Sequence, residues 1–178
     1  MRGSGCAHDD TAPSPSDVLA RAEQRCRDRH LQFTPLRRRV LETLVSARQP
    51  LGAYDLVGRL SEAGRRVAPI SVYRVLDFLT ELGLVHRIAT RNTYLPCEHA
   101  HEADAALMFL ICGCCGGIDE RTSPNLEGAL DRTAASVGFK PLSRVVEIEG
   151  ECARCQERGA AAPRGRRHSP NRHPAAGC

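Results

Sequence analysis

Two Cys-x-x-Cys pairs constrain the fold of this chain more than any other feature. Cys112 and Cys115 form the first pair, and Cys152 and Cys155 form the second after an interval of thirty-six residues. Structural Zn²⁺ is commonly bound by four thiolates in a tetrahedron, and each pair supplies a knuckle at the end of a strand. A bound Zn²⁺ would join the strand before the first pair to the strand before the second. The spacing therefore predicts a structural zinc site with these four cysteines as ligands.

Thiol–disulfide exchange is the competing interpretation, because Cys-x-x-Cys also occurs in oxidoreductases. Two pairs in one chain, neither of them in a βαβ pattern, favour zinc over redox chemistry. Cys114 lies inside the first pair and is left spare by the pairing. We expect no chemical role for three further cysteines, Cys6, Cys26 and Cys178.

The sequence predicts a cytoplasmic protein. It has no apolar run long enough to span a membrane, and residues 1–17 lack the apolar core of a signal peptide. Thiols are kept reduced in the cytoplasm, so nine cysteines there indicate metal binding rather than disulfides. We therefore expect no membrane partner.

Charge is distributed unevenly along the chain. Residues 17–95 carry a net charge of +6 and residues 96–156 a net charge of −5, within a total of +4. This split indicates two modules with different partners, although chance segregation of surface charge is the alternative. The chain has no Trp, three Tyr and four Phe, too few rings to stack on single-stranded nucleic acid. If the basic half binds nucleic acid, we expect duplex DNA.

Residues 16–96 have the pattern of a winged helix-turn-helix domain. The start and stop signals of its helices are Ser16, Thr34-Pro35, Gly64, Ala68-Pro69 and Gly83. Residues 84–88 and 93–95 then flank a turn at 90–92, which predicts a β-hairpin. Helix, helix, helix and hairpin is the order of a winged helix, whose last helix enters the major groove.

The second half predicts a β-β-α-β module with a thin core. Its expected elements are strands at 107–111 and 145–149, a turn followed by a strand within 116–120, and a helix at 124–137. A module of this size needs a metal or a partner subunit to be stable. Residues 1–15 and the basic residues 157–178 lack apolar periodicity, and we expect both to be disordered tails.

A second group of metal-ligating residue types lies between the two halves. His86 is on the first strand of the hairpin, and the rest of the group is Cys97, His99, His101 and Glu120. Side chains two apart in an extended segment share a face, so Cys97, His99 and His101 point the same way. A thiolate, imidazoles and a carboxylate form a plausible Zn²⁺ ligand set. A polar surface linker explains the same residues equally well.

The chain resembles the ferric uptake regulator family over about residues 17–156. The stretches that carry the resemblance are LRRRVL at 36–41, AYDL at 53–56, SVYRVL at 71–76 and LGLVH at 82–86, with the two Cys-x-x-Cys pairs. The resemblance implies an α+β homodimer with three parts in each subunit. These are a winged-helix DNA-binding domain (16–96), a hinge (97–105) and a small α/β dimerisation domain with an antiparallel sheet (106–156).

The resemblance also implies a regulatory zinc site at the hinge, with His86, Cys97 and Glu120 at ligand positions. His101 is assigned as the fourth ligand, with His99 as the alternative. The His-rich run that iron-sensing members carry before the first Cys-x-x-Cys is replaced here by ADAAL at 103–107. A thiolate ligand favours Zn²⁺ over Fe²⁺. We expect one structural and one regulatory Zn²⁺ per subunit.

The expected function is a zinc-responsive transcriptional repressor that binds double-stranded operator DNA as a dimer. Arg74 is expected to contact a base edge, and the further candidates for DNA contact are Tyr54, Ser71, Tyr73, Arg37 and Arg38. The first alternative is a sensor of iron, manganese or peroxide within the same family. The second is a zinc or thiol enzyme, but the sequence has no HExxH motif, nucleophile–base pair or phosphate-binding glycine loop. We expect neither enzymatic activity nor a small-molecule substrate.

Overall fold

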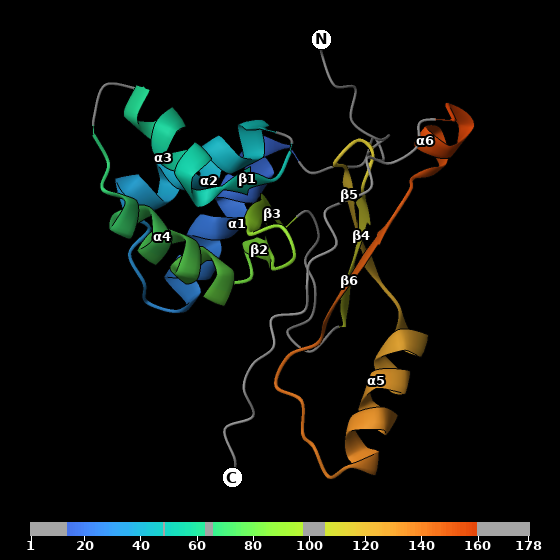
Figure 1. Ribbon diagram of the computed structural model, residues 1–178. Helices are drawn as coiled ribbons and strands as arrows, with labels where there is room; N and C mark the ends of the chain where they lie inside the picture. Colours follow the sequence, from blue (N-terminus) through green and yellow to red (C-terminus); the bar gives the residue numbers. More distant parts are fainter. Residues whose placement is uncertain (1–13, 48, 63–65, 98–105, 160–178) are drawn as a thin grey trace, which may run out of the picture.

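A computed structural model describes residues 14–47, 49–62, 66–97 and 106–159 of this protein. Figure 1 shows two groups of elements side by side. The first group comprises α1 (Pro15–Asp28), α2 (Pro35–Ala47), β1 (Leu51–Gly52), α3 (Ala53–Glu62), α4 (Pro69–Glu81), β2 (Val85–Ile88) and β3 (Thr93–Pro96). The second comprises β4 (Leu107–Cys112), β5 (Ile118–Thr122), α5 (Pro124–Ser136), β6 (Val145–Gly150) and α6 (Ala153–Glu157). Across the described ranges, no helix combines the length and apolar character required to cross a bilayer.

Helix α1 begins earlier than the sequence predicted. Ser14, not Ser16, is its N-cap, because Pro15 takes the first helical position and Asp17 completes a capping box. The Asp17 backbone N–H donates to Ser14 Oγ at 3.2 Å, and the Ser14 backbone N–H donates to Asp17 Oδ2 at 3.2 Å. The buried residues of α1 are Val18, Ala22 and Cys26, which recur every four positions and form an apolar stripe.

The first group of elements confirms the predicted winged helix-turn-helix. Pro35 and Pro69 are the first residues of α2 and α4, as predicted, and Gly83 adopts a left-handed φ of 63° just after α4. Strands β2 and β3 form the predicted hairpin, and β1, which the sequence analysis missed, adds a third strand in the order β1-β3-β2. The largest fully buried side chains of this group are Leu41, Leu44, Leu56, Leu76, Leu79 and Leu84.

The second group contains a mixed three-stranded sheet in the order β5-β4-β6. Strands β4 and β5 are antiparallel, with Phe109 opposite Glu120, which confirms the predicted antiparallel pairing. Strand β6 runs parallel to β4, with Phe109 opposite Glu147, because β5 ends and β6 begins beside the first residue of β4, and α5 connects them at that end of the sheet. Phe109 and Ile111 share a small buried cluster with Ile88 from β2, so the hairpin packs against this sheet.

Helix α5 leaves an apolar surface uncovered within one subunit. Figure 1 shows α5 beyond the end of the second sheet, away from α1–α4. No residue of α5 is buried, and Val137, its C-cap, is 79% exposed. The exposed apolar side chains in and after this helix are Val137, Phe139, Leu142, Val145 and Ile148.

Candidate metal centres and nucleic-acid interface

The four cysteines of the two Cys-x-x-Cys pairs lie together at one end of the second sheet. Cys112 ends β4, Cys115 lies in the turn before β5, Cys152 is the N-cap of α6 and Cys155 lies within α6. Their sulfur atoms all lie within 4.8 Å of one another, and the Cys115 and Cys152 sulfurs are 3.9 Å apart. The parallel β4–β6 ladder produces this convergence because it ends with Cys112 opposite Gly150.

The pKa values of the four-thiol cluster are those expected of a site that binds a cation. Burial raises the pKa of Cys112. Hydrogen bonds from the backbone N–H groups of Cys115, Cys152 and Cys114 lower it by more, so that the pKa is about 6. Hydrogen bonding with Cys152 and burial raise the pKa of Cys155. One thiolate therefore forms readily, while the last proton leaves only when a positive ion replaces it. Four sulfur ligands suit tetrahedral Zn²⁺.

A second cluster lies between the hairpin and the second sheet. His86 is on β2, Cys97 directly follows β3 and Glu120 is on β5, and one ligand atom from each lies within 4.8 Å of the others. His86 Nε2 is 3.4 Å from Glu120 Oε1, whose side chain is only 2% exposed. The Cys97 backbone N–H donates to the Leu84 carbonyl at 2.9 Å, which extends the hairpin and places the thiol beside His86.

The electrostatics of this cluster are those of a site for a cation. Burial alone would lower the pKa of His86, but hydrogen bonds with Cys97 and Glu120, and their negative charge, raise it to about 9. The imidazolium is thus the positive charge of the metal-free cluster. A sulfur, a nitrogen and an oxygen donor that converge in a buried position fit Zn²⁺. His99 and His101, the predicted candidates for a fourth ligand, lie outside the described residues.

Arg21 is a residue of this site that the sequence analysis missed. Its guanidinium, on α1, donates to the carbonyl oxygen of Cys97. This contact spans 76 residues of sequence, and α1 shows only an ordinary polar face at position 21. No local signal in the sequence could have connected the two residues.

The predicted DNA-contacting residues fall into two groups in the structure. Tyr54 on α3 is 74% exposed, and its ring lies edge-on to Tyr73 of α4 with centroids 6.5 Å apart. Arg74 of α4 is exposed and Ser71 is half-buried. Tyr54 lies on the first turn of α3, and the other three residues lie on the first two turns of α4.

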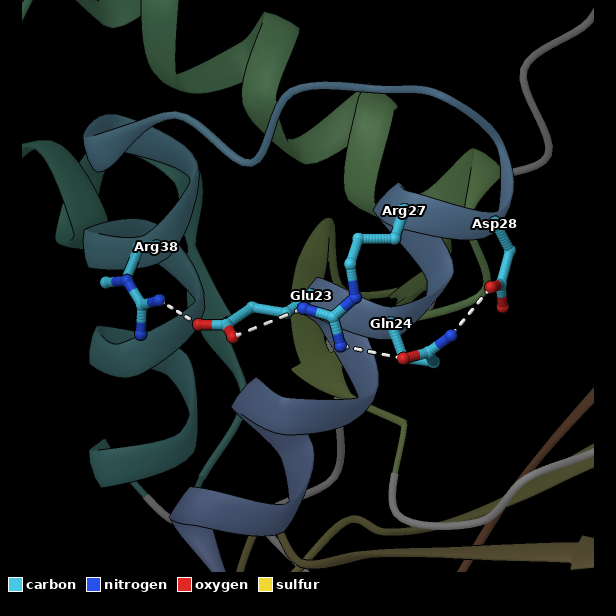
Figure 2. Close-up of polar contacts among 5 residues, drawn as sticks. All are labelled: Glu23, Gln24, Arg27, Asp28 and Arg38. Atoms are coloured by element: carbon cyan, nitrogen blue, oxygen red, sulfur yellow. Dashed lines mark hydrogen bonds and ion pairs between the residues drawn. The ribbon is translucent and has the colours of Figure 1, made fainter.

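Arg37 and Arg38 are held by contacts within the protein. The Arg37 guanidinium lies 3.3 Å from the centroid of the Phe78 ring. Figure 2 shows Arg38 paired with Glu23 of α1, which also approaches Arg27 at 3.9 Å. Their guanidinium groups therefore stabilise the packing of α2 against α4 and α1, in addition to any role at DNA.

The motif pattern of the Ferric uptake regulator family matches residues 28–149 of this chain. The chain belongs to this family. The matched range includes all of α2–α5 and β1–β5 and most of β6, and it contains both clusters except Cys152 and Cys155.

The chain is similar both to relatives named for zinc and to relatives named for iron. The zinc uptake regulation protein of Escherichia coli K12 is 36% identical over 141 residues, which cover 79% of this chain and 82% of that protein. The ferric uptake regulation protein of Neisseria meningitidis serogroup A is 25% identical over 136 residues, 75% of this chain and 92% of that protein. A solved structure described as a zinc uptake regulator complexed with zinc and DNA has a TM-score of 0.78 and 34% identity, over 84% of this chain and 99% of that one.

Proposed function

We propose that this protein is a zinc-responsive transcriptional repressor that binds duplex DNA as a dimer. The observation that carries the proposal is the cluster of His86, Cys97 and Glu120 between the hairpin and the second sheet. Its thiolate favours Zn²⁺ over Fe²⁺. The relatives named for zinc, and the related structure with zinc and DNA, support the same assignment.

The proposed switch depends on which parts of the chain the three ligands belong to. His86 and Cys97 move with the winged helix, whereas Glu120 belongs to the second sheet. Bound Zn²⁺ would supply the positive charge that holds these donors together. In that state His86 has lost its proton, and the orientation of the hairpin relative to β5 is restricted. Zn²⁺ binds this restricted orientation more tightly than the unrestricted one. DNA affinity rises by the ratio of these two zinc affinities.

The proposed DNA-reading surface is the first two turns of α4 with Tyr54 beside them. Arg74 is exposed there and can form a bidentate contact with guanine O6 and N7. Tyr54, Ser71 and Tyr73 lie close enough to contact neighbouring bases or phosphates, while Arg37 and Arg38 are assigned to the DNA backbone.

We assign the remaining parts of the chain as follows. Residues 16–96 are the DNA-binding domain, 97–105 the hinge and 106–156 the dimerisation domain. The predicted tails, 1–15 and 157–178, are too long, because Ser14 and Pro15 cap and begin α1 and Glu157 ends α6. The exposed apolar side chains around α5 and β6 are the proposed contact with a second copy. Each subunit holds two Zn²⁺, one at the four cysteines and one at the hinge, where His101 or His99 completes the ligands.

A metal-dependent gel shift on the Cys97→Ser variant tests this function. Duplexes are first selected from a random pool by wild-type protein at controlled free zinc. We expect Cys97→Ser to need at least about tenfold more free zinc for half-maximal DNA binding, because a neutral hydroxyl replaces a thiolate ligand. Cys178→Ser, which changes a cysteine that belongs neither to a Cys-x-x-Cys pair nor to the predicted hinge ligands, is the control and should match wild type.

Two outcomes would contradict the proposal. One is DNA binding by Cys97→Ser with the zinc response of wild type. The other is a wild-type response to Fe²⁺ or Mn²⁺ at lower free metal than Zn²⁺, which would favour an iron or manganese sensor.

A further inference from the structure

The turn of the hairpin docks on strand β6 through one carboxylate. We call residues 89–92, between β2 and β3, the wing turn. Glu147 Oε1 accepts a hydrogen bond from the Ala89 backbone N–H at 2.7 Å, and its Oε2 accepts from the Thr90 backbone N–H at 3.0 Å. The Thr90 hydroxyl donates to the same Oε2. Both oxygens of Glu147 are therefore engaged by the DNA-binding half of the chain.

The residue after Thr90 makes a second contact with the same sheet. Arg91 Nη2 donates to the carbonyl oxygen of Cys112 at 3.2 Å, and Arg91 Nε lies 3.6 Å from Glu149 Oε1. Cys112 belongs to the four-thiol cluster, so the wing turn reaches the end of β4 that this cluster organises. The wing turn contacts Cys112 on β4 and Glu147 on β6. A cluster that holds these two strands together therefore also fixes both contacts of the wing turn.

The register of the sheet explains why these groups meet. Glu147 and Glu149 are two residues apart on β6, so their side chains share one face. Ile88, the last residue of β2, is fully buried with Phe109 and Ile111 of β4. The wing turn directly follows this apolar contact. Apolar burial therefore brings the turn to β6, and Glu147 then satisfies its backbone N–H groups.

Glu147 is charged at neutral pH in this arrangement. Burial raises the pKa of Glu147. The hydrogen bonds from Thr90 and Ala89 lower it by more, so that the pKa lies below its ordinary value. Charge-assisted hydrogen bonds of this kind are the stronger class.

We propose that Glu147 is a positioning residue for the hinge metal site: it fastens the wing turn to β6 and so holds His86 where Cys97 and Glu120 converge. His86 lies on β2, three residues before Ala89, and Ala89 directly follows this strand, so β2 and the turn after it are attached to the second sheet at two places. With the turn released, metal binding must first order the hairpin against the sheet, which lowers the apparent affinity. The inference rests on the proposed function, because it concerns the affinity of the proposed hinge site.

The test compares Glu147→Gln with Glu149→Gln, two isosteric changes that remove the same charge from the same face of β6. Zinc binding to the hinge site is measured by competition with a chelating indicator, after the tighter site is filled. We expect Glu147→Gln to weaken hinge binding by about 5- to 50-fold, within the usual range of coupling between sites. Glu149→Gln should change it by less than about twofold, because its ion pair with Arg91 is longer and exposed.

Two further readouts separate positioning from a general loss of structure. The Co²⁺-substituted hinge site should keep the shape of its sulfur-to-cobalt absorption in Glu147→Gln, because the ligands are unchanged. Thr90→Val removes one hydrogen bond to Glu147 and should weaken binding on its own, but add little in the Glu147→Gln background. If Glu147→Gln does not fold, Thr90→Val alone still tests the contact.

The inference is overturned if Glu147→Gln binds hinge zinc like wild type, or if the effects of Thr90→Val and Glu147→Gln multiply independently. Failure of the proposed function looks different. In that case wild-type protein itself takes up no hinge zinc, or binds DNA equally with and without it.

Discussion

At the scale of single residues, the proposed switch depends on the proton of His86. Its imidazole is 13% exposed and lies between a thiol and a carboxylate, and its ring is tilted against Phe109 with centroids 5.4 Å apart. The raised pKa of about 9 means that the metal-free protein holds a proton where Zn²⁺ would bind. A proton and a metal ion therefore compete for the same nitrogen.

This competition predicts the pH dependence of the hinge site. Because Zn²⁺ binds neutral imidazole, its apparent affinity should rise about tenfold per pH unit from pH 6 to 8.5 and level off above about 9. In the metal-free protein the sign is opposite. The protonated His86 stabilises the fold below its ordinary pKa of about 6.5, and this stabilisation is lost as the pH rises through about 9.

Titration with a competing chelator at several pH values, with the proton release measured by calorimetry in two buffers, checks this prediction. An affinity that does not change over this range would show that His86 is already neutral in the metal-free protein. In that case the hinge cluster would not hold a proton in place of the metal.

At the scale of elements, the four-thiol cluster substitutes for a core that the second half lacks. The buried apolar cluster there consists of Ile88, Phe109, Ile111 and Ile118, one of which comes from the winged helix. Strands β4 and β6 meet with Cys112 opposite Gly150, and α6 begins directly at Cys152. Zinc at this end would hold three elements that have little apolar burial of their own.

Cys152→Ser should therefore destabilise the protein strongly. Loss of a structural metal belongs to the class of changes that cost about 4 kcal/mol or more, which is roughly 10 °C in Tm for a chain of this length. Cys114→Ser is the matched control from the same knuckle and should shift Tm by less than about 2 °C. Thermal unfolding with hydrogen exchange of β4 and β6 measures both. Equal melting of the two variants would mean that Cys114 serves as a ligand.

At the scale of the whole molecule, a single subunit leaves large apolar side chains exposed to solvent. Leu142 is 93% exposed and Phe139 is 66% exposed, and α5 lies at the far end of the second sheet from α1–α4 (Figure 1). Large apolar side chains left exposed in one part of a chain indicate contact with another protein. A second copy would cover it and place two DNA-reading helices in one particle related by a twofold axis.

Phe139→Asp should weaken this dimer, because it places a charge in an apolar contact. We expect at least about a tenfold increase in the dimer dissociation constant, measured by sedimentation velocity over a range of concentrations. Leu31→Asp is the control, since Leu31 is an exposed apolar residue of the first half at 42%. A Phe139→Asp protein with wild-type sedimentation would place the subunit contact elsewhere.

The amino-acid sequence by itself determined the features that depend on neighbouring residues. Helix starts at Pro35 and Pro69, the stop at Gly83 and the hairpin with its turn were all predictable, because caps, prolines and turns act over a few positions. The order of these elements also indicated the winged helix, and the motif spacing grouped the four cysteines.

Only the tertiary structure decided the features that join distant segments. The parallel pairing of β6, the contact of Arg21 with Cys97 and the docking of the wing turn on Glu147 span 38 to 76 residues. The sequence left open whether His86, Cys97 and Glu120 are a cluster or a polar linker, and their ligand atoms lie within 4.8 Å. Such contacts arise when buried side chains such as Ile88 and Phe109 pack the two halves together. That packing depends on three-dimensional complementarity, for which no local pattern in a single sequence exists.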